Sequence, residues 1–171
     1  MLKFTGKLLL SALMMSPMAV MADNNYVRLG VGESTFDYSG IPSDHPTGGL
    51  LALGTQLDPV WGVEGGLVDF GRVDVISLNN QPAKLSVRAL YGAGTANWSV
   101  SPQASVYGKL GLAVKYASGA GDSATRVSPL LGIGARYMFT REWGAAVEYT
   151  HYGSNGGLAL SQATVSALYH F

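Results

Sequence analysis

Apolar and polar residues alternate along this chain in short segments, and the alternation is clearest in the last nine residues. From Ala163 to Phe171 every second side chain is apolar, and the side chains between them are mostly polar. A period of two residues indicates a β-strand whose two faces meet different surroundings. Since the apolar row runs to Phe171 itself, we expect this strand to pair with the first one, so that the sheet closes without an open edge.

The same periodicity predicts eight strands, with loops or turns between them. They are expected at residues 25–36, 48–57, 61–70, 84–98, 103–116, 127–139, 143–152 and 158–171. The strand segments contain no run of eighteen apolar residues, which excludes a helical membrane protein. Ten residues at about 3.3 Å each, tilted by roughly 45°, rise about 24 Å, close to the apolar band of an outer-membrane barrel. We therefore predict an all-β fold, an eight-stranded antiparallel up-and-down transmembrane β-barrel.

The expected connections alternate in length, as in barrels with short periplasmic turns and longer outer loops. The short ones lie at residues 58–60, 99–102 and 140–142, and the long ones at residues 37–47, 71–82 and 117–126, although the last connection, at residues 153–157, is also short. Trp61 and Trp143 directly follow a short turn, Trp98 directly precedes one, and Phe139 precedes the third. We expect these four side chains at one end of the barrel, as an aromatic girdle at the membrane interface.

One face of the strands carries most of the glycines and also charged side chains. The charged set is Arg28, Glu64, Arg88, Lys109, Lys115, Arg136 and Glu148. A Lys or Arg at mid-depth on the lipid face would cost about 2–4 kcal/mol, so we assign this face to the interior. The interior of an eight-stranded barrel is just wide enough for side chains to fill it. We predict an interior plugged by a charge network, in which surplus basic groups bond to carbonyls, hydroxyls, Tyr107 or water.

Residues 1–22 are predicted to be a secretory signal peptide. Lys3 and Lys7 precede an apolar run that is too short for a membrane span of about 20 residues, and small residues precede Asp23. We expect export through the Sec pathway and one mature barrel domain, residues 23–171. Without the two lysines, nine Lys and Arg stand against eleven Asp and Glu, and there is no cysteine. This composition gives no basic stripe for a nucleic acid and excludes disulfides.

The signal peptide, the alternating strands, the inward charges and the C-terminal segment 167–171 resemble the OmpA-like family of small eight-stranded outer-membrane β-barrels. The resemblance covers the whole mature chain. It implies a Gram-negative outer-membrane protein that anchors or stabilises the envelope, in some members with adhesive outer loops or a low, porin-like conductance. Tyr169 and Phe171 match the C-terminal signal by which the outer-membrane assembly machinery recognises its substrates.

A second segment, His151-Tyr152-Gly153-Ser154-Asn155, is similar to the His-Tyr-Ser-Asn element of the lipid A 3-O-deacylase family. A His beside a Ser, with a third group that orients the His, is what nucleophilic acyl transfer requires. Here Gly153 separates the Tyr from the Ser, and no acidic residue follows Glu148. An interfacial His and a Ser-Asn-Gly turn explain the segment without chemistry. We expect no enzyme activity, no cofactor and no metal site.

These observations favour a monomer with a structural, envelope-anchoring or surface-interaction role. The expected partners are outer-membrane lipid, lipopolysaccharide and, during biogenesis, the assembly machinery; no nucleic acid is expected. A narrow low-conductance channel is the alternative hypothesis, and a lipid A deacylase-like hydrolase is the third.

Overall fold

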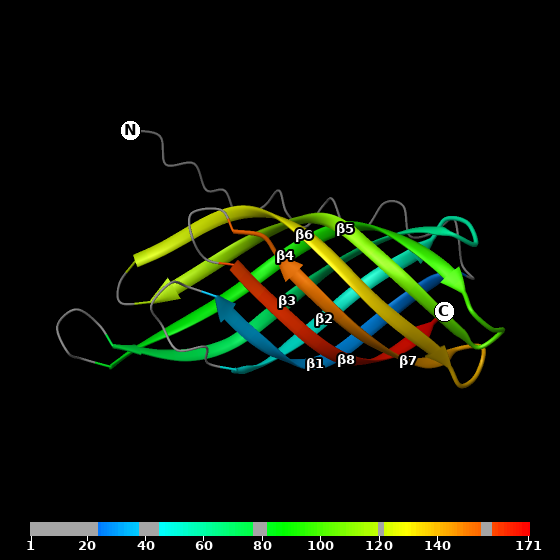
Figure 1. Cartoon of the computed structure of the whole chain (residues 1–171), viewed down its shortest axis with the longest axis horizontal. Coiled ribbons are helices and arrows are strands. Elements are labelled where there is room, and N and C mark those ends of the chain that lie inside the picture. The colour runs from blue at the N-terminus through cyan, green and yellow to red at the C-terminus, as the bar shows by residue number, and fades with distance from the viewer. Residues whose placement is uncertain (1–23, 38–44, 77–81, 120–121, 155–158) are drawn as a thin grey trace.

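A computed structural model describes residues 24–37, 45–76, 82–119, 122–154 and 159–171, so the predicted signal peptide lies outside the described residues. The strands are β1 (Asn25–Asp37), β2 (Thr47–Gln56), β3 (Trp61–Ile76), β4 (Pro82–Ser99), β5 (Ala104–Gly119), β6 (Asp122–Met138), β7 (Trp143–Tyr152) and β8 (Ala159–His170). Each pairs antiparallel with its neighbours in sequence, and together they form a closed barrel. The strands are tilted relative to the long axis of the barrel (Figure 1). This confirms the predicted fold class.

The pairing of β1 with β8 closes the barrel. Their register runs from Tyr26 opposite His170 to Asp37 opposite Ala159. The Phe171 amide extends it by donating a hydrogen bond to the Asn25 carbonyl, at 3.0 Å. The first and last strands therefore have no open edge, which is the condition for a sheet to cross a bilayer. No helix in the described ranges is long and apolar enough to cross a membrane.

The two faces of the sheet have the polarity of a barrel wall in lipid. The outward side chains of Leu112, Ile133 and Val165 are 60%, 67% and 60% exposed, whereas the inward Lys109 and Glu148 are buried. This is the reverse of the pattern in a soluble protein, where charged side chains are almost never fully buried. It is the arrangement that a lipid-facing wall around a polar interior requires.

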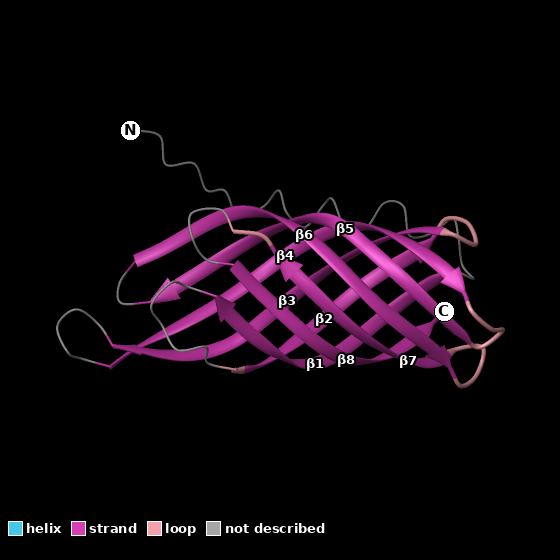
Figure 2. Cartoon of the chain, in the orientation of Figure 1, coloured by secondary structure: helices cyan, strands magenta, loops and turns pink. Residues whose placement is uncertain are grey.

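Two outer hairpins are longer than the periodicity indicated. β3 and β4 stay paired as far as Ile76 and Pro82, and β5 and β6 as far as Gly119 and Asp122. They extend well into the predicted loops, at the end of the barrel opposite the short turns (Figure 2). In β3 the alternation itself continues past Gly71, with Arg72 and Asp74 alternating with Val73 and Val75, so the predicted end of this strand was too early.

The faces of β4 are the reverse of those expected from the sequence. Val87, Ala89 and Tyr91 point inward and are 1%, 1% and 3% exposed, whereas Trp98 points outward. Arg88 and Trp98 are ten positions apart, and since this is an even number a regular strand puts both side chains on the same face. The prediction that placed Arg88 inside while Trp98 faced lipid was therefore wrong for Arg88.

An interior charge cluster

Four charged side chains meet inside the barrel, one from each odd-numbered strand. We call Arg28 (β1), Glu64 (β3), Lys109 (β5) and Glu148 (β7) the interior cluster. Arg28 Nη1 lies 3.1 Å from Glu64 Oε2 and 2.9 Å from Glu148 Oε2, while Lys109 Nζ lies 3.2 Å from Glu64 Oε1 and 2.6 Å from Glu148 Oε1. Each cation thus bridges both carboxylates, and the charges of the four groups balance.

Hydroxyl groups complete the hydrogen bonding of the two carboxylates. Tyr26 and Tyr91 donate to Glu64 at 2.9 and 2.7 Å, and Tyr107 and Thr150 donate to Glu148, both at 2.8 Å. The four cluster side chains are between 0% and 3% exposed. Buried charges are tolerated when they are paired and hydrogen-bonded in this way, because each ion would otherwise lose several kcal/mol of hydration.

Three of the tyrosines fit because a glycine lies directly opposite each of them on the neighbouring strand. Tyr26 faces Gly54, Tyr91 faces Gly66 and Tyr107 faces Gly134 in the strand register. A methyl group added at Gly66 would lie 2.8 Å from the Tyr91 ring, and one at Gly134 would lie 2.6 Å from Tyr107 Cζ; at Gly54 it would clash with the Tyr26 ring. The missing side chains let the rings cross the neighbouring strand and reach the cluster.

Two further cations lie inside the barrel but outside the interior cluster. Arg136 lies between two aromatic rings, with its guanidinium carbon 4.9 Å from the ring centre of Tyr26 and 5.0 Å from that of Tyr107. Its Nε and Nη2 atoms have no hydrogen-bond partner in the described part of the chain. Lys115 donates from Nζ to the Gly153 carbonyl at 3.0 Å. Surplus basic groups are thus held by rings and a carbonyl.

Arg88 is the one residue of the predicted interior set that lies outside the barrel interior in the structure. Its side chain lies on the outer wall, 68% exposed, and its Nε donates to Asp69 Oδ2 at 3.1 Å. The other six predicted residues are buried in the interior. The sequence also missed Tyr91 as a partner of Glu64, because the expected phase of β4 turned that residue outward. A tyrosine opposite a glycine on an adjacent strand was the available signal.

The aromatic side chains predicted to form a girdle all point outward at the end with the short turns. Trp61, Trp98, Trp143 and Phe139 are 58%, 55%, 53% and 63% exposed. Tyr169 lies beside them, with its ring centre 4.7 Å from that of Trp143, and Phe171 lies 6.3 Å from Tyr169. Aromatic side chains exposed together at one level are typical of a membrane interface.

The predicted His151 and Ser154 are not brought together as a pair. His151 lies on the outer wall, and its Nδ1 is 3.0 Å from the hydroxyl of Ser161 on β8. Ser154 is exposed, and Asn155 lies outside the described residues. His151 is paired with Leu131 of β6 and with Ser161 of β8. Neither of these neighbours is a carboxylate that could orient the imidazole ring.

The fold and its interior define a class: small eight-stranded outer-membrane barrels, here with ion-paired side chains in the interior. The model of the outer membrane protein beta-barrel domain matches residues 5–171, and the chain belongs to that family. This places it in a Gram-negative outer membrane. No curated protein sequence matches it at a level that shows a relationship.

Solved structures show the same fold at low sequence identity. Ail, the attachment invasion locus protein of Yersinia pestis, is 18% identical with a TM-score of 0.67, and covers 88% of this chain and 100% of its own. Neisserial surface protein A is 13% identical with a TM-score of 0.65, covering 86% and 97%. A de novo designed transmembrane β-barrel matches with a TM-score of 0.56 and 18% identity, covering 88% and 98%. Because a designed barrel matches too, the likeness carries the fold and not a role.

Proposed function

We propose that this protein is a structural barrel that anchors the envelope and presents its outer hairpins for surface interaction, with no chemistry of its own. The observation that carries the proposal is the interior cluster. Its side chains from β1, β3, β5 and β7 meet across the lumen in four ion pairs, while Arg28 Nε and Nη2 have no hydrogen-bond partner among the described residues. Such a cluster fills an eight-stranded barrel and stabilises it, and it leaves the outer surface as the part available to partners.

The proposed partners follow from the exposed apolar belt and from the C-terminal strand. Outer-membrane lipid and lipopolysaccharide contact the exposed apolar belt, and the assembly machinery binds the terminal strand through Tyr169 and Phe171 during biogenesis. The signal peptide at residues 1–22 directs the chain through the Sec pathway. The barrel works as a monomer, because closure leaves no strand edge for a second copy.

The plug is tested by planar-bilayer recording on the refolded protein. We expect no stable conductance steps from the wild-type chain. The alternative is a narrow channel, which is favoured by the surplus of interior cations. Arg28, Lys109, Lys115 and Arg136 outnumber Glu64 and Glu148, so such a channel would select anions. Stable, anion-selective steps would overturn the plug and establish the channel.

Surface interaction is tested at the outer hairpins. Ail was crystallised with the heparin analogue sucrose octasulfate, which makes heparin a rational probe. Cells displaying the wild-type protein are compared with cells displaying a variant whose residues 77–81 and 120–121 are replaced by Gly and Ser. Hairpin-dependent heparin binding supports the proposal. Equal binding by both variants, or by neither, argues against surface interaction of this kind and leaves envelope anchoring as the role.

A further inference from the structure

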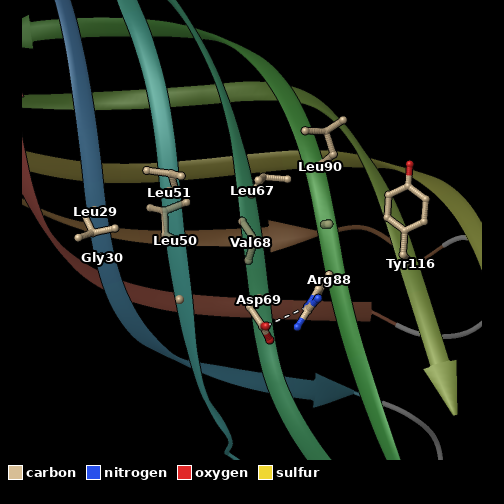
Figure 3. A pocket seen from close by; sticks show the side chains of 12 residues that line it. Leu29, Gly30, Leu50, Leu51, Leu67, Val68, Asp69, Arg88, Leu90 and Tyr116 are labelled. Atoms are coloured by element: carbon tan, nitrogen blue, oxygen red, sulfur yellow. Dashed lines mark hydrogen bonds and ion pairs between the residues drawn. The ribbon is translucent and has the colours of Figure 1, made fainter. Parts of the chain in front are cut away.

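The outer wall of the barrel carries a groove across β1 to β5 (Figure 3). Its volume is about 600 Å³, which lies within the roughly 300–1,000 Å³ typical of ligand sites. Leu29, Leu51, Leu67 and Leu90 from four consecutive strands line it, together with Tyr116. Asp69 and Arg88 lie at one side of the same groove (Figure 3). An apolar trough bordered by charge has the form of a site for an amphiphile.

The groove exists because one outward position has no side chain. Gly49 on β2 lies in the register between Val31 of β1 and Asp69 of β3. A methyl group added there would meet only the Gly30 carbonyl oxygen, at 3.9 Å. A Cβ therefore has room at this point, and a side chain built on it would project into the groove.

The ion pair marks the outer boundary of the apolar belt. Asp69 accepts a hydrogen bond from the Gly71 amide on Oδ1, at 2.9 Å, and one from Arg88 Nε on Oδ2, at 3.1 Å. Gly71, at φ 83°, lies within the irregularity between Asp69 and Arg72 where the β3–β4 register shifts. Both Asp69 oxygens are thus used, and they fix the guanidinium in place. Beyond this level β3 and β4 continue into the outer hairpin.

Arg88 keeps two donor nitrogens for a ligand. Its Nη1 and Nη2 atoms make no hydrogen bond to any described residue, and its side chain is 68% exposed. Arg72 is also exposed and lies in register with Ser86, two residues farther out along β4. Arg88 and Arg72 thus place two cations beside Asp69 on this part of the wall. A guanidinium held in this way binds phosphate with two parallel hydrogen bonds.

We propose that the groove binds lipid A, with an acyl chain along the leucines and a phosphate on Arg88. The occupant must combine an acyl chain with a phosphate and must reside in the outer leaflet, at the level where the ion pair lies. Lipid A meets these conditions. The inference rests on the proposed envelope-anchoring role, to which it adds a defined lipid partner and its site.

The test measures the apparent Kd of the refolded full-length protein for purified lipid A in detergent micelles, by native mass spectrometry. Gly49→Leu fills the groove and Arg88→Gln removes the guanidinium. We expect Arg88→Gln to weaken binding by about tenfold or more through the loss of a charge-assisted contact, and Gly49→Leu by a similar factor because it occupies the space for the acyl chain. Gly92→Leu is the matched control, because Gly92 faces outward with nothing within 4 Å of an added Cβ. It should change the Kd by no more than about twofold.

Two further arms define the ligand and separate the proposals. The Kd of the wild-type protein for dephosphorylated lipid A should equal the Kd of the Arg88→Gln variant for intact lipid A. The wild-type protein should bind phosphatidylglycerol more weakly than lipid A. Wild-type affinity in both groove variants would overturn the site, and equal affinity for phosphatidylglycerol would overturn lipid A as its ligand. Heat-modifiable gel migration verifies that each variant folds. Since the variants leave the outer hairpins intact, heparin binding by the same proteins tests the proposed function independently.

Discussion

At the scale of single residues, the interior cluster concentrates the electrostatic cost of folding in one place. Replacing Glu148 by Gln keeps the shape of the side chain but leaves Arg28 and Lys109 with one carboxylate between them. Breaking a buried pair on one side typically costs about 3–5 kcal/mol, because the remaining charge is desolvated and unpaired. We expect a loss of this size in the free energy of unfolding, measured by urea titration of the protein refolded into lipid vesicles.

Two control variants distinguish the cost of a buried unpaired charge from the cost of losing an exposed ion pair. Asp69→Asn breaks an ion pair whose side chains are 44% and 68% exposed, so it should cost at most about 1 kcal/mol. The double variant Lys109→Met/Glu148→Gln restores the charge balance and should be less destabilised than the sum of its single variants. A Glu148→Gln variant as stable as Asp69→Asn would show that the interior is hydrated enough to screen the cluster.

Glycine 134 gives a second residue-scale prediction. An added methyl group would lie 2.6 Å from both Tyr107 Cζ and the Val147 carbonyl oxygen. The ring would have to move and lose its contacts with Glu148 and Arg28, so Gly134→Ala should lower the free energy of unfolding by about 1–3 kcal/mol. Gly92→Ala, which meets nothing, should stay within about 0.5 kcal/mol of wild type. Equal effects at the two positions in the same urea assay would contradict the steric explanation.

At the scale of elements, β4 is the strand whose orientation most needs an experiment. Spin labels on single cysteines at Ala89 and Leu90 sample its two faces at nearly the same depth. Because Ala89 points inward, its label should be shielded from lipid-soluble oxygen, whereas the label at Leu90 should be strongly relaxed by it. The accessibilities are measured by power-saturation electron paramagnetic resonance in vesicles, with Leu112 as the lipid-facing reference. A reversed pair of accessibilities would return Arg88 to the interior.

The same strand shows where the sequence was informative and where it was not. The period of two residues identified all eight strands. In β5 it also assigned the inward and outward faces correctly, because one row holds Lys109 and Lys115 and the other holds Leu110 and Leu112. In β4 each row mixes apolar and polar residues, since Val87 and Tyr91 share one row with Thr95 and Asn97 while Leu90 shares the other with Arg88, so hydrophobicity could not separate the rows. The charge of Arg88 then decided the orientation wrongly, since a charge is also tolerated on the wall where the apolar belt ends.

Partners in the interior were predictable by type and not by identity. The need for hydroxyls and carbonyls around surplus cations follows from burial alone, and Tyr107 and the Gly153 carbonyl fill that role. The pairing of Arg28 with both carboxylates depends on the register of strands that are distant in sequence. The alternation within a single strand does not reveal that register, because it repeats every two residues.

At the scale of the whole molecule, the three tryptophans report how the barrel sits in the bilayer. All are exposed, and all lie at strand ends beside the short turns. If that end lies at an interface, their fluorescence should be quenched more by lipids brominated near the headgroup than by lipids brominated near the chain end. As the matched control, a variant with the three tryptophans changed to Phe and with Ile133→Trp carries its fluorophore midway along the β6 wall, and its order of quenching should be reversed. Similar quenching of both proteins by both lipids would mean that the wall has no defined depth. The aromatic girdle, the apolar belt and the level assigned to Arg88 would then all be wrong together, because each depends on the same axial position.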